Sequence, residues 1–167
     1  MGITKQERTV IKVKRNGIGD SRTVGHMPTF EEFQAANDSH IQDVSNVMEL
    51  FADMVLNAGS QHDWTKKKYE GDFYRDMCLA MNDPDFNFEE APWYQMHIAT
   101  ERHHVTKHCK DDVNLIDILE HLVDCVCAGK ARNSTGKVYP VKVDDDILRK
   151  AVENTVKMLE YCVVVED

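Results

Sequence analysis

Apolar residues recur at helical spacing in three long segments of this 167-residue chain. Spacings of three and four residues place such side chains on one face of a helix, so each segment is expected to form an amphipathic helix. The stripes comprise Ile41, Val44, Val47, Met48, Phe51, Met54 and Val55, then Val113, Ile116, Leu119, Leu122, Val123 and Val126, then Ile147, Leu148, Val152, Val156, Met158 and Leu159. We therefore predict an all-α fold, a bundle of about five to six helices.

Shorter helices are predicted around these segments. Thr29 and Glu32 have the spacing of a capping box and would open a short helix, while Asp38-Ser39 would open the first long one. Helical patterns also cover residues 64–82 and run from Trp93 to about His104.

Residues 1–28 are predicted to form an N-terminal arm outside the helical domain of residues 29–167. Residues 9–15 alternate between apolar and polar side chains and precede Asn16-Gly17, a pair typical of hairpin turns. The arm is expected to be either a hairpin that caps the domain or contacts another copy, or a frayed terminus.

The net charge limits the classes of possible binding partner, and the cysteine pattern indicates the cellular compartment. The chain has 29 acidic and 20 basic residues, a net charge of −9, which argues against tight nucleic-acid binding but not against small anionic substrates. The five cysteines are odd in number and form no CxxC pair, which favours reduced thiols in the cytoplasm. We expect neither a signal peptide nor a membrane span.

Several histidines and aspartates have the composition of a metal site. The candidates are His40, His62, Asp63, His97, His103, His104 and Asp124. Imidazole and carboxylate groups together suit divalent Mn, Fe, Co, Ni or Zn, and the core of a helical bundle can hold ligands that converge from separate helices.

Asp124 is the most informative of these residues, because it lies in the apolar stretch Leu122-Val123-Asp124-Cys125-Val126. A carboxylate there is costly unless it is paired or binds a metal. Glu120 lies one helical turn earlier and could position a ligand or act as a general base. The alternative is that Asp124 pairs with a lysine or caps a neighbouring helix.

The order His40, then His62-Asp63, then Asp124 resembles the HD superfamily of metal-dependent phosphohydrolases. Four motifs resemble a group of small HD-like proteins of bacteria and phages, which carry HD-x-S-K, W-x-x-H, N-x-H-H and a late E-x-x-x-D. The corresponding segments are residues 62–66, 93–97, 101–104 and 119–124. The resemblance covers roughly residues 38 to 130 and implies an HD-type helical bundle.

The resemblance also implies roles for these residues. His40, His62, Asp63 and Asp124 would bind a first ion, and His97 with His103 or His104 would complete a second site that shares Asp63. A water activated by metal would then attack phosphorus. Lys66 stands at the family's lysine and would contact a substrate phosphate, as Arg102 would if it faces the site.

Two departures from the family pattern matter. The asparagine of N-x-H-H is replaced, because Glu101 and Arg102 precede the histidine pair. His97 and His103 are also only six residues apart. Either His97 and His104 share one face of a continuous helix, or the helix breaks before Arg102.

The leading functional hypothesis is a metal-dependent phosphohydrolase acting on a nucleotide or another small phosphate ester, with one or two ions. Two alternatives keep the fold: a di-iron oxygenase, and a catalytically silent HD fold that binds a nucleotide or a protein. A homodimer is compatible with any of the three.

Overall fold

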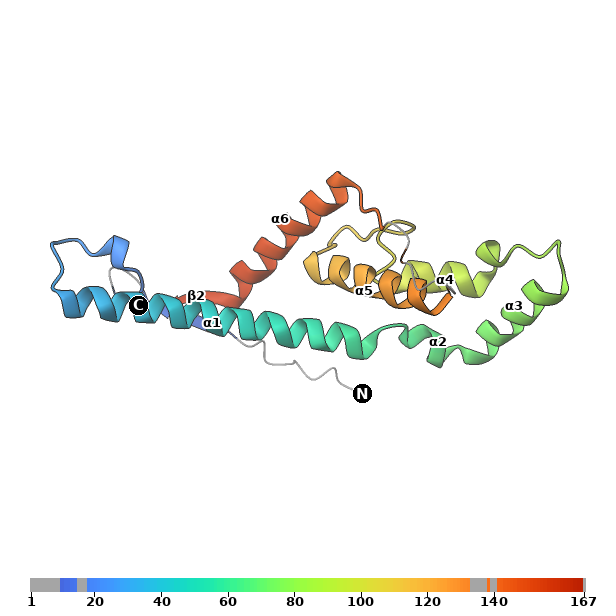
Figure 1. The fold of residues 1–167 in the computed structure, drawn as a ribbon, viewed down its shortest axis with the longest axis horizontal. Coiled ribbons are helices and arrows are strands. Elements are labelled where there is room, and N and C mark those ends of the chain that lie inside the picture. Colours follow the sequence, from blue (N-terminus) through green and yellow to red (C-terminus); the bar gives the residue numbers. More distant parts are fainter. Residues whose placement is uncertain (1–9, 15–17, 133–137, 139–140, 167) are drawn as a thin grey trace. The chain divides into compact units, whose positions relative to one another are not determined.

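The computed structural model describes residues 10–14, 18–132, 138 and 141–166, and these are mainly helical (Figure 1). The elements in chain order are β1 (Ile11–Lys14), η1 (Ser21–Thr23), α1 (Phe30–Gln61), α2 (Trp64–Lys68), α3 (Glu70–Asn82), η2 (Phe88–Glu90), α4 (Pro92–Thr100), α5 (Leu115–Arg132), α6 (Asp145–Cys162) and β2 (Val163–Glu166). The predicted all-α class is confirmed, with one two-stranded sheet in addition. Among the described residues, no helix is both long enough and apolar enough to span a bilayer.

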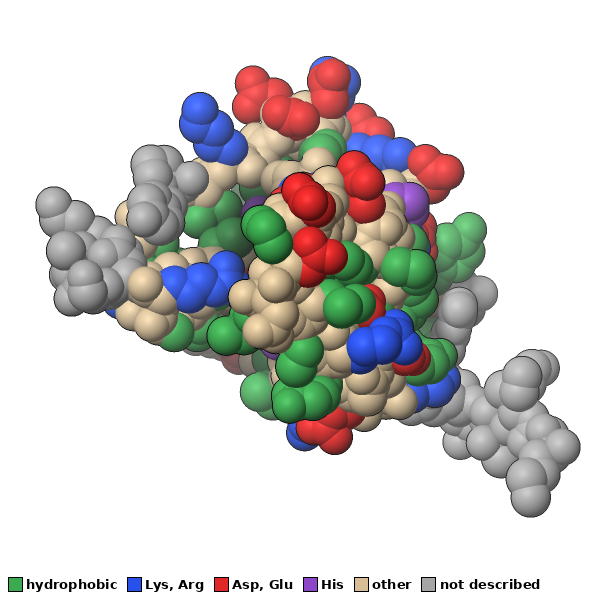
Figure 2. Space-filling view, turned by 90° about the vertical axis from the view of Figure 1, so that its right-hand side faces the viewer, with side chains coloured by type: hydrophobic (Ala, Val, Ile, Leu, Met, Phe, Trp, Pro, Cys, Tyr) green, Lys and Arg blue, Asp and Glu red, His purple; other side chains and the backbone are tan. Residues whose placement is uncertain are grey.

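The described residues fall into two compact units. Those within 1–54 and 155–167 form the terminal unit, and those within 55–154 form the central unit. This division differs from the predicted boundary at residue 28, because β1 joins the opposite end of the chain. Acidic side chains are visible on the face drawn in Figure 2, as the net charge of −9 leads one to expect.

The N-terminal strand does not form the predicted hairpin. β1 pairs in parallel with β2, with Ile11 opposite Val163 and Lys14 opposite Glu166. The predicted turn residues Asn16-Gly17 lie outside the described residues. The alternating pattern of residues 9–15 therefore indicated a strand correctly, but its partner is distant in sequence.

Helix α1 merges two helices that the sequence suggested were separate. The capping box forms as predicted, since Glu32 N donates to Thr29 Oγ1 (3.2 Å) and Thr29 N donates to the Glu32 carboxylate (2.8 Å). The helix then runs through Asp38-Ser39 without a break. Residues 30–58 contain neither Pro nor Gly, so nothing there interrupts the backbone hydrogen bonds.

Two further helices are shorter than predicted. The expected helix over residues 64–82 is divided at Tyr69 into α2 and α3. Helix α4 ends at Thr100 and not near His104, because Glu101 adopts an extended conformation and its N–H caps the His97 carbonyl (2.9 Å). The helix therefore breaks before Arg102, and His103 and His104 lie in the loop that follows.

The core of the central unit supports this loop. Val105, Val113, Ile118 and Ala151 form a buried cluster, against which Leu115, Val143 and Ile147 pack. On another side, Trp93 is buried and stacks on Phe73 with ring centroids 4.1 Å apart. Because Val105 follows the two histidines closely, its burial fixes the end of the segment that carries them.

Candidate metal centre

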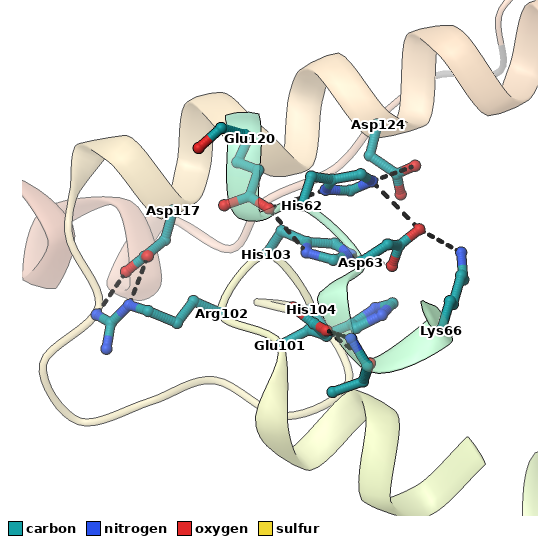
Figure 3. A network of polar contacts seen from close by, with 12 residues as sticks. His62, Asp63, Lys66, Glu101, Arg102, His103, His104, Asp117, Glu120 and Asp124 are labelled. Atoms are coloured by element: carbon teal, nitrogen blue, oxygen red, sulfur yellow. Dashed lines mark hydrogen bonds and ion pairs between the residues drawn. The ribbon is translucent and has the colours of Figure 1, made fainter. Parts of the chain in front are cut away.

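Two groups of potential ligands converge within the central unit. Asp63, His97, His103 and His104 form the inner group, and His62, His103 and Asp124 form the outer group; within each group the ligand atoms lie within 4.8 Å of one another. Figure 3 shows His62, Asp63, His103, His104 and Asp124 pointing toward a common centre. The ligand groups draw on four places in the chain: the α1–α2 link, α4, the loop after α4, and α5. The His and Asp side chains are thus positioned to bind a metal ion.

Asp63 belongs to the inner group and also borders the outer group, because its Oδ2 faces His62. Its backbone is left-handed (φ 57°), a conformation that aspartate tolerates better than most residues, and it turns the chain between α1 and α2. Its Oδ1 atom is buried and has no hydrogen-bond partner among the described residues, and it lies 3.5 Å from His97 Nε2 and 3.7 Å from His103 Nε2. A buried carboxylate oxygen without a partner is costly, and a cation bound between it and the imidazoles would remove that cost.

His97 is held by a chain of buried hydrogen bonds. The Thr65 backbone N–H and its hydroxyl both donate to Glu101 Oε1, at 2.8 and 2.6 Å. With its proton directed at Glu101, the Thr65 hydroxyl accepts from His97 Nδ1–H (2.7 Å). This tautomer leaves Nε2 without a proton, so that it can accept from His104 Nε2 (2.9 Å) or bind a metal instead, and Trp93 stacks on the ring at 4.9 Å.

Glu120 positions two imidazoles from the side opposite the ligand atoms. Its Oε1 accepts from His62 Nδ1 at 2.8 Å and lies 3.1 Å from His103 Nδ1, a close electrostatic contact outside hydrogen-bond geometry. The Nε2 atom of His62 then faces Asp63 Oδ2 (3.3 Å) and Asp124 Oδ1 (3.6 Å). Of the two predicted roles for Glu120, this placement favours the positioning role over that of a general base.

The histidines differ in how readily they accept a proton. Burial lowers the pKa of His97, and burial together with the neighbouring imidazoles lowers the pKa of His104 to about 3. Burial also opposes charge on His103, but Glu120, Asp63 and Asp124 outweigh it and raise the pKa of His103. His97 and His104 are therefore neutral ligands at neutral pH, with their Nε2 atoms 2.9 Å apart.

Lys66 and Arg102, both predicted to bind substrate, have different surroundings. Lys66 pairs with Asp63 Oδ2 at the edge of the inner group, and this pairing, which outweighs burial, lowers the pKa of Asp63. Arg102 points away from the histidines (Figure 3) and is held by Asp117 through Nε (2.7 Å) and Nη2 (2.8 Å), and by Asp112 through Nη1. Its donors are already engaged, so the structure does not support a phosphate-binding role for Arg102.

His40 lies in the terminal unit, whereas both ligand groups lie in the central unit. It is an exposed residue of α1 in the terminal unit, where it lines an apolar pocket with Val44 and Val47, and neither ligand group among the described residues includes it. The metal-binding role predicted for His40, from its chemistry and from the resemblance, stays a prediction. The order of the motifs in the sequence did not indicate that the chain divides into a terminal and a central unit.

Two residues that hold His97, Thr65 and Glu101, were not predicted as members of the site. Thr65 stands at the serine position of the HD-x-S-K motif, and this was the available signal for its role. Glu101 was noted only because the family's asparagine is absent there. No protein-family model matches the chain, and neither a curated protein nor a solved structure matches it significantly.

Proposed function

We propose that this protein is a metal-dependent phosphohydrolase that acts on a small phosphate ester, with nucleotides among the candidate substrates. The observation that carries the proposal is the buried Asp63 Oδ1, which lacks a hydrogen-bond partner among the described residues and faces the Nε2 atoms of His97 and His103. The resemblance of the motifs to HD-type phosphohydrolases supports the reaction class.

The ligand set favours a borderline divalent cation. Four imidazoles and two carboxylates suit Mn, Fe, Co, Ni or Zn better than Ca or Mg, which prefer oxygen ligands. The inner group would hold one ion, and the outer group with Asp63 Oδ2 would hold a second. A divalent ion there would lower the pKa of a bound water and neutralise charge on a phosphoryl group.

The protein's own residues would orient the reaction. Lys66, already paired with Asp63, is close enough to the inner group to exchange that partner for a phosphate oxygen. Hydrolysis joins the water oxygen to phosphorus, breaks the bond from phosphorus to the ester oxygen, and leaves a proton on the released alcohol. Glu120, Thr65 and Glu101 would hold the histidines throughout.

Phosphate release from a substrate panel tests the proposal. The purified protein is stripped of metal, reloaded with Mn, Co or Ni, and assayed with nucleotides and simple phosphate monoesters. Release by the wild type should be abolished in Asp63→Asn, which keeps a residue that tolerates positive φ, and retained in Asp146→Asn, an exposed control on α6. Metal binding without phosphate release from any ester would contradict the proposal.

Metal analysis of the same preparation distinguishes the second candidate. The four histidines of the two groups are also compatible with a di-iron centre. Two irons per chain with visible absorbance, and no phosphate release, would favour oxygen chemistry. Nucleotide binding with no bound metal would indicate a silent fold.

A further inference from the structure

An apolar pocket opens directly beside the outer ligand group. It has a volume of about 310 Å³ and is lined by His62, Glu120 and Asp124 on one side. The remaining wall comes from the end of α1 and from α5, through the aliphatic residues Val55, Ala58, Ile116, Leu119 and Val123. Every lining residue belongs to the central unit, so the pocket and the ligand groups share one compact body.

The chemistry of the wall restricts what it can hold. Among the described residues, no Lys, Arg, Phe, Tyr or Trp lines the pocket, and its only strongly polar side chains are the three that belong to the metal centre. A polyphosphate would lack cationic partners there. A nucleobase would find no Phe, Tyr or Trp to stack on, and its only hydrogen-bond partners would be the side chains of the metal centre, whereas sites that select bases provide dedicated partners.

We infer that this pocket binds the alcohol part of the substrate, and that the preferred substrates are phosphate monoesters of aliphatic or simple aryl alcohols. The inference rests on the proposed function, since the phosphate would lie at the ligand groups while the apolar group enters the pocket. His62 and Asp124 belong both to the wall of the pocket and to the outer ligand group, so the pocket and the metal centre are continuous. Water then gives the free alcohol and inorganic phosphate.

Substitution of Gly59 can make the pocket smaller without replacing a potential metal ligand. Gly59 lines the pocket in the last turn of α1, and a Cβ added there meets no atom within 4 Å. Gly71, on α3 and outside the pocket, has equally open space and provides a matched control. Both positions are helical, so replacing glycine with leucine favours the helix in each case.

The first test compares phenyl phosphate with glycerol 2-phosphate and a nucleoside monophosphate. The wild type should have the lowest KM for phenyl phosphate. Gly59→Leu should raise that KM about tenfold or more, the size of effect that steric change in an apolar pocket produces, whereas Gly71→Leu should leave it unchanged. Equal KM values for all three esters, or no effect of Gly59→Leu, would overturn the inference.

The second test does not depend on turnover. Cys127 is exposed and lines the pocket, while Cys109 is exposed elsewhere. Phenylphosphonate, which cannot be hydrolysed, should slow alkylation of Cys127 but not of Cys109, as followed by fragmentation mass spectrometry of the modified peptides. Methylphosphonate should protect Cys127 less, and equal protection by the two would count against the pocket.

The two tests separate the inference from the proposed function. If no ester is hydrolysed with any metal but phenylphosphonate still protects Cys127, the proposed function fails and the pocket remains a binding site. If esters are hydrolysed but neither Cys127 protection nor Gly59→Leu distinguishes the aryl group, the proposed function stands and the inference fails.

Discussion

The inner and outer ligand groups are adjacent but differ in how firmly they are held. His103, which both groups share, is almost fully buried, but His97 of the inner group has a side chain 4% exposed, whereas His62 and Asp124 of the outer group are 28% and 32% exposed. The buried hydrogen bonds through Thr65 and Glu101 orient only His97. Because pre-oriented ligands lose less freedom on binding, the inner group should hold the tighter ion.

The largest effect is expected at Asp63, because its two oxygens face the two groups. Asp63→Asn should remove both ions and reduce activity by more than the roughly 100-fold loss typical of residues that only support a ligand. Metal content after equilibrium dialysis is the measurement. If the variant retained one tight ion, the two groups would be more independent than the geometry indicates.

Substitutions of residues that belong to only one ligand group can distinguish metal binding at the inner group from metal binding at the outer group. His104 belongs only to the inner group and Asp124 only to the outer one. His104→Asn should weaken the tighter binding step, and Asp124→Asn the weaker step, each by at least about 10- to 100-fold. Competition with a chelator of known affinity measures both steps. The reverse assignment would mean that burial does not decide the order of binding.

A pair of substitutions at Thr65 tests the hydrogen bonds behind His97. Thr65→Val removes the hydroxyl while keeping the shape, and Thr65→Ser keeps the hydroxyl. We expect Thr65→Val to lower the affinity for the first ion about 10- to 100-fold and Thr65→Ser to have little effect. Similar losses in both variants would point to packing, since Thr65 is completely buried.

The raised pKa of His103 gives a pH dependence with a definite sign. Metal and proton compete for its Nε2, so affinity should fall as pH decreases through the pKa of His103, which lies above the ordinary value of 6.5. Glu120→Gln removes the main electrostatic cause of that rise. In Glu120→Gln, the pH at which half of the metal affinity is lost should therefore be lower than in the wild type. The metal affinity of this variant at pH 8 should also be weaker. Metal titrations from pH 5.5 to 8.5 measure this midpoint in both proteins. The same midpoint in the wild type and in Glu120→Gln would exclude Glu120 as the cause of the raised pKa of His103.

The smallest effect on the site is expected at Arg102. Because its guanidinium binds Asp117 and Asp112, Arg102→Gln should leave KM within about twofold. Its cost should appear in the free energy of unfolding, about 1–3 kcal/mol, because the buried Asp117 carboxylate loses a charged partner. A large rise in KM at unchanged stability would restore Arg102 as a phosphate ligand.

Local signals in the sequence predicted local structure well. The capping box at Thr29 formed as expected, and the apolar stripes of α1, α5 and α6 gave the fold class. The end of α4 was harder to predict, because it depends on a long-range contact. Glu101 leaves the helix to accept from Thr65, which is 36 residues away in the chain.

The candidate site was also predicted only in part, because some of its residues gain their role through contacts between distant parts of the sequence. Asp124 among apolar residues and the His62-Asp63 pair can be recognised in a single sequence, and all three residues belong to the two ligand groups. His40 belongs to the terminal unit, and its predicted role stays a prediction. Thr65 and Glu101 are ordinary residues in sequence and gain their role only through burial against His97.

X-ray absorption spectroscopy of the protein loaded with one equivalent of zinc tests the central claim most directly. The inner group predicts three imidazole nitrogens and one carboxylate oxygen at about 2.0–2.1 Å, with no sulfur neighbour. A shell made mainly of oxygen, a sulfur neighbour, or a spectrum unchanged in Asp63→Asn would contradict the assignment of the metal to this group.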